Sequence, residues 1–334
     1  MKAIVNTARG AAAQTLALAE IARPDPTEGE VRVRVVASGL NPSDVKVRAG
    51  AQGPMVADRV IIHNDGAGVI DAVGKGVDPA RIGARVWLYE VNRAGGGLSQ
   101  GTVGTAAEYV CVPDGLAVPL PENTGFDEGA CLGVPAMTAH RAVTCGGDVA
   151  GKTVLVTGGA GAVGHSAIQI AKAMCARVIA TVSSDVKAQI AMQAGADATV
   201  NYRDEDLVAR LQTLAPEGVD HVADVDFAAH VALYPAFLKV GATVGAYATA
   251  TNLAPEVPFY PLAFRNIAVQ PFVVYSMSAS AKAAAIADIG RMLAAGQLTP
   301  RIGARFAMAD TAQAHEALEA GGVVGNIVIQ ISAE

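Results

Sequence analysis

Hydrophobic and polar residues alternate along much of the first third of the chain, which is the pattern of half-buried β-strands. The clearest case is the run Val31-Arg32-Val33-Arg34-Val35-Val36. Further short strands are indicated at residues 59–62, 68–73 and 84–88, and turn sequences rich in proline and glycine separate them. The pattern predicts a compact β domain over residues 1–125.

From about Asp127 the pattern changes to alternating strands and helices. Apolar strand-like runs at 153–157, 177–182, 198–201, 221–225 and 242–246 are separated by helical patterns such as 187–195 and 204–214. This order predicts βαβ units and a parallel sheet over residues 126–262, and hence the α/β class. Two more helical patterns and a strand at 326–331 follow, so residues 263–334 are expected to complete this domain and return to the first.

One glycine-rich turn carries the clearest chemical signal. The run Val154-Leu155-Val156-Thr157 leads into Gly158, and Gly159-x-Gly161-x-x-Gly164 follows at the start of a helical pattern. In this context Gly159 is expected to make a tight turn, Gly161 to let the backbone approach a pyrophosphate, and Gly164 to let helix and strand pack closely. Ala160, Ala162 and Val163 complete the turn, whose free N–H groups would face the phosphates. The segment predicts a doubly wound Rossmann domain that binds a dinucleotide.

The residues after the next strand favour one dinucleotide over another. An Asp or Glu about 20 residues past the glycines selects NAD, but this place holds Ser183 and Ser184, followed by Lys187. Two hydroxyls and an ammonium suit a ribose 2′-phosphate, which predicts NADPH. Alternatively, Ser183 caps the next helix and Lys187 lies on a solvated face; both interpretations can hold together.

Charge and composition narrow the class of protein. The net charge is -6 and no Lys/Arg run occurs, which argues against a nucleic-acid partner. No apolar run reaches the length of a membrane span, and Arg9 and Gln14 interrupt any signal-peptide core, so a cytoplasmic protein is expected. The four cysteines are too widely spaced for a zinc knuckle or a redox pair.

Several segments together resemble the medium-chain dehydrogenase/reductase superfamily, most closely its zinc-free quinone oxidoreductase (zeta-crystallin-like) branch. They are Ser38-Gly39-Leu40-Asn41-Pro42-Ser43-Asp44, Asp65-Gly66-Ala67-Gly68-Val69-Ile70, Ala107-Glu108-Tyr109, Gly133-Val134-Pro135-Ala136-Met137-Thr138-Ala139 and Asn201-Tyr202-Arg203. The resemblance implies a GroES-like catalytic domain followed by the Rossmann domain.

The resemblance also implies roles for individual residues. Asn41 and Thr138 are expected at the nicotinamide end of the cofactor, and Tyr202 beside the 2′-phosphate with the two serines and Lys187. Asn326 is expected to contact the cofactor where the branch commonly has a lysine. Asp44 is expected to order the active-site loop. Lys46 is a candidate donor to the acceptor's oxygen, or else a solvated lysine at the pocket rim.

The chain departs from the family at some of these positions. Lys46 and Gln52 stand where the branch often carries tyrosines. The cysteine and histidine ligands of zinc-dependent relatives are replaced by Asn41-Pro42 and His63-Asn64-Asp65, so no catalytic metal is expected.

These features predict hydride transfer from NADPH to a quinone or a similar activated carbonyl, which needs little electrophilic help. The alternatives are a 2-alkenal or enone reductase, a non-catalytic NADPH-binding structural or regulatory protein, and a zinc alcohol dehydrogenase with unusual ligands. An apolar edge segment at 269–275 favours a homodimer.

Overall fold

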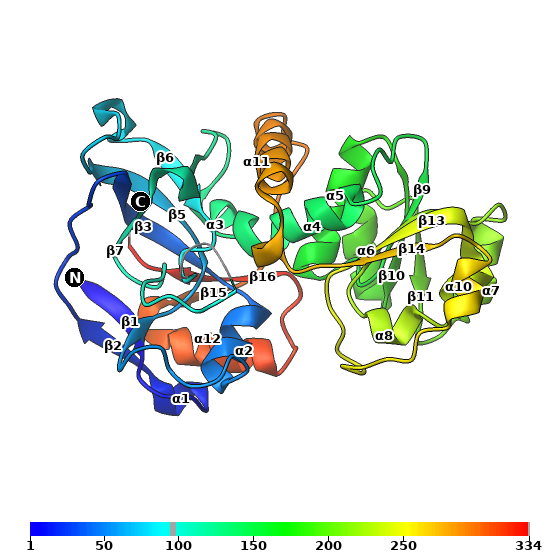
Figure 1. The fold of residues 1–334 in the computed structure, drawn as a ribbon, viewed down its shortest axis with the longest axis horizontal. Helices are drawn as coiled ribbons and strands as arrows, with labels where there is room; N and C mark the ends of the chain where they lie inside the picture. The colour runs from blue at the N-terminus through cyan, green and yellow to red at the C-terminus, as the bar shows by residue number, and fades with distance from the viewer. Residues whose placement is uncertain (94–97, 333–334) are drawn as a thin grey trace. The chain divides into compact units, whose positions relative to one another are not determined.

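The computed structural model describes residues 1–93 and 98–332, which form two compact units. The first contains Met1–Pro135 and Thr299–Glu334, and the second contains Ala136–Leu298 (Figure 1). The domain boundaries expected at residues 125 and 262 stay a prediction.

The strands of the first unit pair mostly antiparallel, as its alternating sequence predicts, but Ile302–Ala307 and Asn326–Gln330 pair parallel. A three-stranded sheet has the order β2-β1-β4, and a larger sheet has the order β15-β16-β3-β5-β6-β8, with β7 also paired to β3. The strands are β1 (Lys2–Asn6), β2 (Leu16–Glu20), β3 (Glu30–Leu40), β4 (Val60–Ile61), β5 (Asp65–Val73), β6 (Arg85–Leu88), β7 (Tyr109–Pro113), β8 (Ala117–Pro119), β15 (Ile302–Ala307) and β16 (Asn326–Gln330). The last strand, β16, pairs antiparallel with β3, so the end of the chain closes this sheet.

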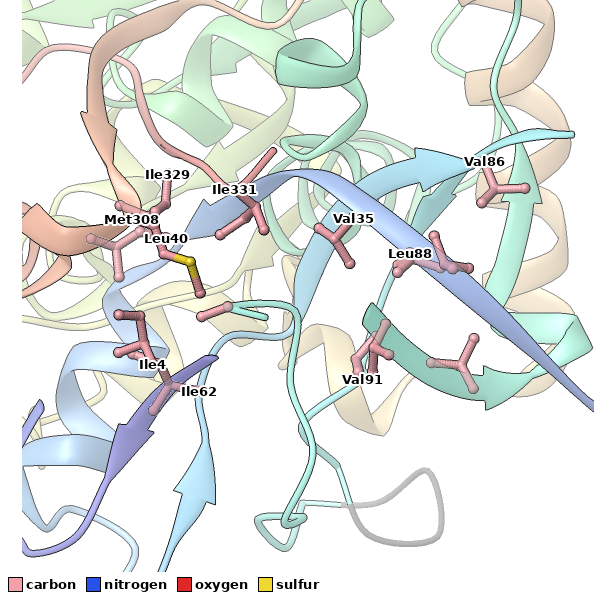
Figure 2. Close-up of a cluster of buried hydrophobic side chains, with 14 of the residues drawn as sticks. Ile4, Val35, Leu40, Ile62, Val86, Leu88, Val91, Met308, Ile329 and Ile331 are labelled. Carbon is pink, nitrogen blue, oxygen red and sulfur yellow. The ribbon is translucent and has the colours of Figure 1, made fainter. Parts of the chain in front are cut away.

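Among the described residues of this unit, the α-helices are α1 (Ala12–Thr15), α2 (Pro42–Ala49), α3 (Phe126–Gly129) and α12 (Thr311–Glu319). Figure 2 shows the core, where side chains from both ends of the chain meet. Ile4, Val35 and Ile62 lie in one buried cluster with Met308 and Ile329. Burial of such aliphatic side chains is the main favourable contribution to folding of this unit.

The second unit is a doubly wound α/β domain. All pairings in its six-stranded sheet are parallel, with the order β11-β10-β9-β12-β13-β14. The strands are β9 (Thr153–Val156), β10 (Arg177–Val182), β11 (Ala198–Asn201), β12 (Val219–Asp224), β13 (Leu238–Ala246) and β14 (Ala268–Pro271). The order reverses between β9 and β12, which is where such sheets bind ligands, at the carboxyl ends of their strands. The predicted α/β class is confirmed.

The helices of the second unit are α4 (Met137–Thr144), α5 (Ala162–Ala173), α6 (Asp185–Gln193), α7 (Leu207–Leu214), α8 (Phe227–His230), α9 (Tyr234–Phe237), α10 (Phe259–Ala263) and α11 (Ala279–Ala294). The sequence pattern started α7 three residues too early, at 204. The Asp206 side chain accepts a bond from the N–H of Ala209 at 2.9 Å and therefore caps the helix at that point.

The predicted apolar edge segment at 269–275 is only partly strand. β14 ends at Pro271, and a 3₁₀ turn occupies Val274–Ser276. Proline has no N–H for a sheet ladder, so it ends the strand. Within the described residues, no helix is long and apolar enough to cross a membrane.

Candidate active site

The glycine turn joins β9 to α5 as the sequence predicts. The tight turn that the sequence assigned to Gly159 is made by Gly158 instead. Gly158, with φ 67°, is the left-handed residue that makes the tight turn. Gly159 is instead required by packing, since a Cβ there would lie 2.7 Å from the Cβ of Ala180 on β10. The turn therefore uses Gly158 for its conformation and Gly159 for its fit against the sheet.

The other two glycines have contrasting surroundings. A Cβ on Gly164 would lie 2.2 Å from the carbonyl oxygen of Gly158, so this glycine lets the first turn of α5 pack on the loop. A Cβ on Gly161 would meet nothing closer than that same oxygen, at 3.4 Å. Gly161 is exposed and is the N-cap of α5, with no side-chain capping bond and no acid in the first helical turn.

The start of α5 is thus suited to an anion. The first N–H groups of a helix lack partners within the helix, and the dipole is positive there. Ala162 and Val163 in the first turn are partly exposed, whereas Ala160 in the loop is buried. This arrangement can hold a phosphate, as the sequence predicts.

The residues after β10 form the second half of this site. The Nζ of Lys187 donates to the Oγ of Ser183 at 2.9 Å, and the Ser184 hydroxyl accepts from the Lys187 N–H as the cap of α6. The alternative interpretation placed Ser183 at the helix cap, but the cap is Ser184. Tyr202 follows β11, where its N–H bonds the carbonyl of Val182 at 3.1 Å and its side chain is 51% exposed. The structure brings Ser183, Ser184, Lys187 and Tyr202 to one edge of the sheet.

Sequence reasoning missed a buried carboxylate at the carboxyl end of β12, the strand that pairs with β9. Asp224 closes β12 and accepts hydrogen bonds from Thr157 at 2.8 Å and His230 at 2.8 Å, and also from the Tyr234 hydroxyl. Burial raises the pKa of Asp224, but the bonds from His230 and Tyr234 outweigh it and hold that pKa below its usual value. The signal in the sequence was an acid near the carboxyl end of the strand predicted at 221–225, because parallel sheets carry their functional groups at the carboxyl ends of their strands.

In the first unit, the predicted active-site loop is the junction between the end of β3 and the start of α2. Pro42 occupies the first position of α2, and the Asp44 carboxylate accepts the N–H of Asn41 at 2.9 Å, which is half of a capping box. The other oxygen of Asp44 accepts from the Asn64 amide at 2.8 Å. Asp44 thus fixes the turn between β3 and α2, and burial raises its pKa to about 6.

Asn41 itself points to a second buried acid. Its Nδ2 donates to the Oδ2 of Asp65 at 2.8 Å, and both residues are buried. Burial raises the pKa of Asp65 well above its usual value, and the nearby Asp44 carboxyl adds to the increase. Asp65 begins the segment Asp65–Ile70 that resembles the family, and nothing in the sequence indicates its contact with Asn41.

The remaining predicted residues are dispersed. Lys46 lies exposed on α2, and Thr138 is buried on α4 in the second unit. Asn326, in β16, gives its amide to the carbonyl of Arg301 at 2.9 Å. The structure therefore brings Asn41 and Asp44 together and gives Asn326 a partner of its own within the first unit.

The region does not offer the donor set of a catalytic zinc. His63 bonds the Ser38 hydroxyl at 2.9 Å through Nδ1 and the ring of His315 at 3.0 Å through Nε2. Asn41 and Asn64 supply amides that are bonded to carboxylates, where zinc would require thiolate or imidazole. Across residues 1–93 and 98–332, no group of three or more His, Cys, Asp or Glu side chains is placed to hold a metal ion.

Comparison with known proteins identifies the family. Residues 27–122 match the alcohol dehydrogenase GroES-like domain, and residues 162–289 match the zinc-binding dehydrogenase family. The quinone oxidoreductase of Lama guanicoe is 28% identical over 93% of this chain and 91% of its own length.

Two solved structures cover nearly all of the chain. An NAD-dependent alcohol dehydrogenase is 31% identical, with a TM-score of 0.88 over 99% of this chain and 100% of its own. A mycobacterial protein complexed with NADPH is 27% identical, with a TM-score of 0.84 over 99% of this chain and 100% of its own. The chain belongs to the medium-chain dehydrogenase/reductase superfamily and is an oxidoreductase with relatives in the quinone oxidoreductase branch.

Proposed function

We propose that the chain transfers hydride from NADPH to a quinone or a similarly activated carbonyl acceptor, independently of zinc. The observation that carries the choice of cofactor is the cluster of Ser183, Ser184 and Lys187 at the end of β10. The nearest acid, Asp185, lies exposed in the first turn of α6. The similarity to an NAD-dependent enzyme favours NADH, but the groups at this position favour a 2′-phosphate over a free ribose hydroxyl.

The cofactor would be held by two clusters in the second unit. The open N-cap at Gly161 and the first turn of α5 would bind the pyrophosphate, and the Lys187 ammonium with the two serines would bind the 2′-phosphate. Tyr202 would cover the adenosine end. Bound NADPH supplies the hydride, and the protein supplies its position.

The residues of the first unit favour an acceptor that needs no Lewis acid. Asn41 and Asp44 order the turn before α2 through bonds of 2.8 and 2.9 Å to neighbouring groups. The Asn41 amide would orient the reacting groups, and Lys46 is exposed on the same helix, where its ammonium can give a proton to a reduced acceptor. The quinone oxidoreductase of Lama guanicoe supports a quinone as the acceptor.

Steady-state kinetics test this proposal directly. The purified protein is assayed with NADPH and NADH against 1,4-benzoquinone, a bulkier quinone and a 2-alkenal. Higher kcat/KM for NADPH with a quinone supports the proposal, and preference for the 2-alkenal supports the enone reductase. Cofactor binding without turnover of any acceptor would indicate the non-catalytic protein, and stoichiometric zinc would contradict a zinc-independent reaction.

Lys187→Ala is expected to raise the KM for NADPH about tenfold, because one charge-assisted contact to a phosphate is lost. The KM for NADH should stay within about twofold, since NADH lacks the 2′-phosphate. Lys172→Ala is the matched control, since it removes an equal charge from a lysine that pairs with Asp197 at 2.9 Å. Equal losses for NADPH and NADH in Lys187→Ala would contradict the assigned role.

We also propose a homodimer. β14 is the last strand of its sheet in the described chain, with β13 on one side. Beside it, α10 and its C-cap expose Phe259, Tyr260 and Phe264 by 69%, 68% and 83%. Exposed aromatic clusters of this kind are typical of interfaces.

Light scattering is expected to give the mass of two chains for the wild type and of one chain for Phe264→Asp. Val186→Asp, at a position 67% exposed on α6, is the control and should leave the mass unchanged. A monomeric wild type would contradict the dimer.

Free cysteines at all four positions support a reducing compartment, and we propose the cytoplasm.

A further inference from the structure

Asp65 is a fully buried acid whose side chain joins three segments of the first unit. It stands at the start of β5 and is 0% exposed. Its Oδ2 accepts the amide of Asn41, from the end of β3, at 2.8 Å, and the backbone N–H of Val134 at 2.7 Å. One carboxyl oxygen therefore links the predicted reactive amide to the turn that precedes α4.

The second bond fixes the orientation of the Asn41 amide. The backbone N–H of Val134 can only donate, so Oδ2 of Asp65 is an acceptor. As long as Oδ2 of Asp65 carries no proton, the group of Asn41 that faces this oxygen is its NH₂, and the carbonyl Oδ1 of Asn41 points elsewhere. Rotation of the amide by 180° would place two acceptors against each other.

The surroundings leave Asp65 little freedom to move. A Cβ on Gly133 would lie 2.1 Å from Oδ1 of Asp65, so the backbone at 133 closes directly over this carboxyl. The backbone carbonyl of Asp65 accepts the Thr105 hydroxyl at 2.6 Å. Side chain and main chain of Asp65 are thus held by separate contacts, which allows them to be tested separately.

The buried carboxyl can act as an acceptor without a charge. Burial raises the pKa of Asp65 well above its usual value, because it disfavours the charged carboxylate relative to the neutral acid. A neutral carboxyl whose proton lies on Oδ1 still presents Oδ2 to both N–H groups. An asparagine at this position presents its carbonyl oxygen in the same way.

We propose that Asp65 is a positioning residue that holds the Asn41 amide in one orientation, leaving its carbonyl oxygen for the cofactor and the acceptor. This inference rests on the proposed function, because it assigns Asn41 to that reaction. Asp65 acts through Asn41 and contributes geometry, which hydride transfer requires.

Four variants test the inference: Asp65→Asn, Asp65→Ala, Asn41→Ala and the double variant Asn41→Ala/Asp65→Ala. Asp65→Ala is expected to lower kcat with NADPH and a quinone about 10- to 100-fold, as is typical when an orienting partner is lost. Asp65→Asn should keep kcat within about threefold, because the acceptor is retained. In the Asn41→Ala background, Asp65→Ala should cause less than about a twofold further loss, since the amide to be oriented is gone.

Thr105→Val controls for a purely structural effect. It removes the bond to the backbone of Asp65 and should lower the melting temperature while leaving kcat near the wild-type value. Activity losses that follow melting temperature across all variants, or equal losses from Asp65→Ala with and without Asn41, would overturn the inference.

An NMR measurement of side-chain amide exchange separates this inference from the proposed function. The side-chain amide signal of Asn41, assigned by its loss in Asn41→Ala, should show slow hydrogen exchange in the wild type and in Asp65→Asn. A fast-exchanging signal in the wild type overturns the inference even if Asp65→Ala fails to fold. A protected signal in a protein that reduces no quinone leaves the orientation intact and refutes the proposed function instead.

Discussion

Gly161→Val is expected to abolish measurable NADPH binding while the protein stays folded. The backbone at Gly161 has φ -73° and ψ 169°, a conformation open to any residue, and a Cβ there has 3.4 Å of space. The isopropyl group would instead occupy the place of the pyrophosphate at the start of α5. A loss of at least about 100-fold in affinity corresponds to roughly 2.8 kcal/mol.

Gly164→Ala provides the contrast, because its Cβ would lie 2.2 Å from a backbone oxygen that cannot move aside. In this variant the free energy of unfolding should fall by about 1–3 kcal/mol, and NADPH binding should be weakened as well. Fluorescence titration with NADPH and thermal unfolding of both variants are the measurements. Wild-type affinity in a folded Gly161→Val would show that the pyrophosphate lies elsewhere.

The glycine turn could be predicted because its signal is local. Strand, glycines and helix follow one another within about a dozen residues, and the spacing itself defines where the backbone can approach a ligand. The different roles of Gly158 and Gly159 could not be predicted. The role of Gly159 depends on Ala180, which lies on the neighbouring strand β10 and contacts the turn only after the sheet has formed.

The first unit shows the opposite case. Asn41 and Asp65 are 24 residues apart and His63 and His315 are 252 apart, so no periodicity or spacing indicates that their side chains meet. The resemblance to a family selected Asn41 and Asp44 but was silent on what holds them. Alternation predicted strands near Asn41, His63 and Asp65, whereas the partners of these side chains across the unit follow from tertiary packing alone.

The pair of His63 and His315 leads to the second large expected effect: the protein should lose stability steeply below about pH 6.5. The ring nitrogens lie 3.0 Å apart and the rings are stacked, with both side chains at most 1% exposed. A contact between two nitrogens needs one donor and one acceptor, so the two rings cannot both be protonated while this contact is made. Burial lowers the pKa of His63 to about 3 and that of His315 to about 2.

The sign follows from linkage. Both folded-state pKa values lie below the unfolded value of 6.5, so the stabilisation is complete above pH 6.5 and is lost as the pH falls. Each histidine should lower the free energy of unfolding by about 1.4 kcal/mol for each pH unit below 6.5. Urea unfolding between pH 7.5 and pH 5 measures the slope.

His315→Gln isolates the contribution of the pair from that of other groups. Burial also lowers the pKa of His140 and His221, and these residues add to the acid loss in wild type and variant alike. Glutamine keeps a hydrogen-bonding group toward His63 but cannot titrate, so the variant should lose about 1.4 kcal/mol less per pH unit. An unchanged slope would mean that His315 binds as many protons in the folded protein as in the unfolded chain over this pH range, which would contradict a neutral buried ring.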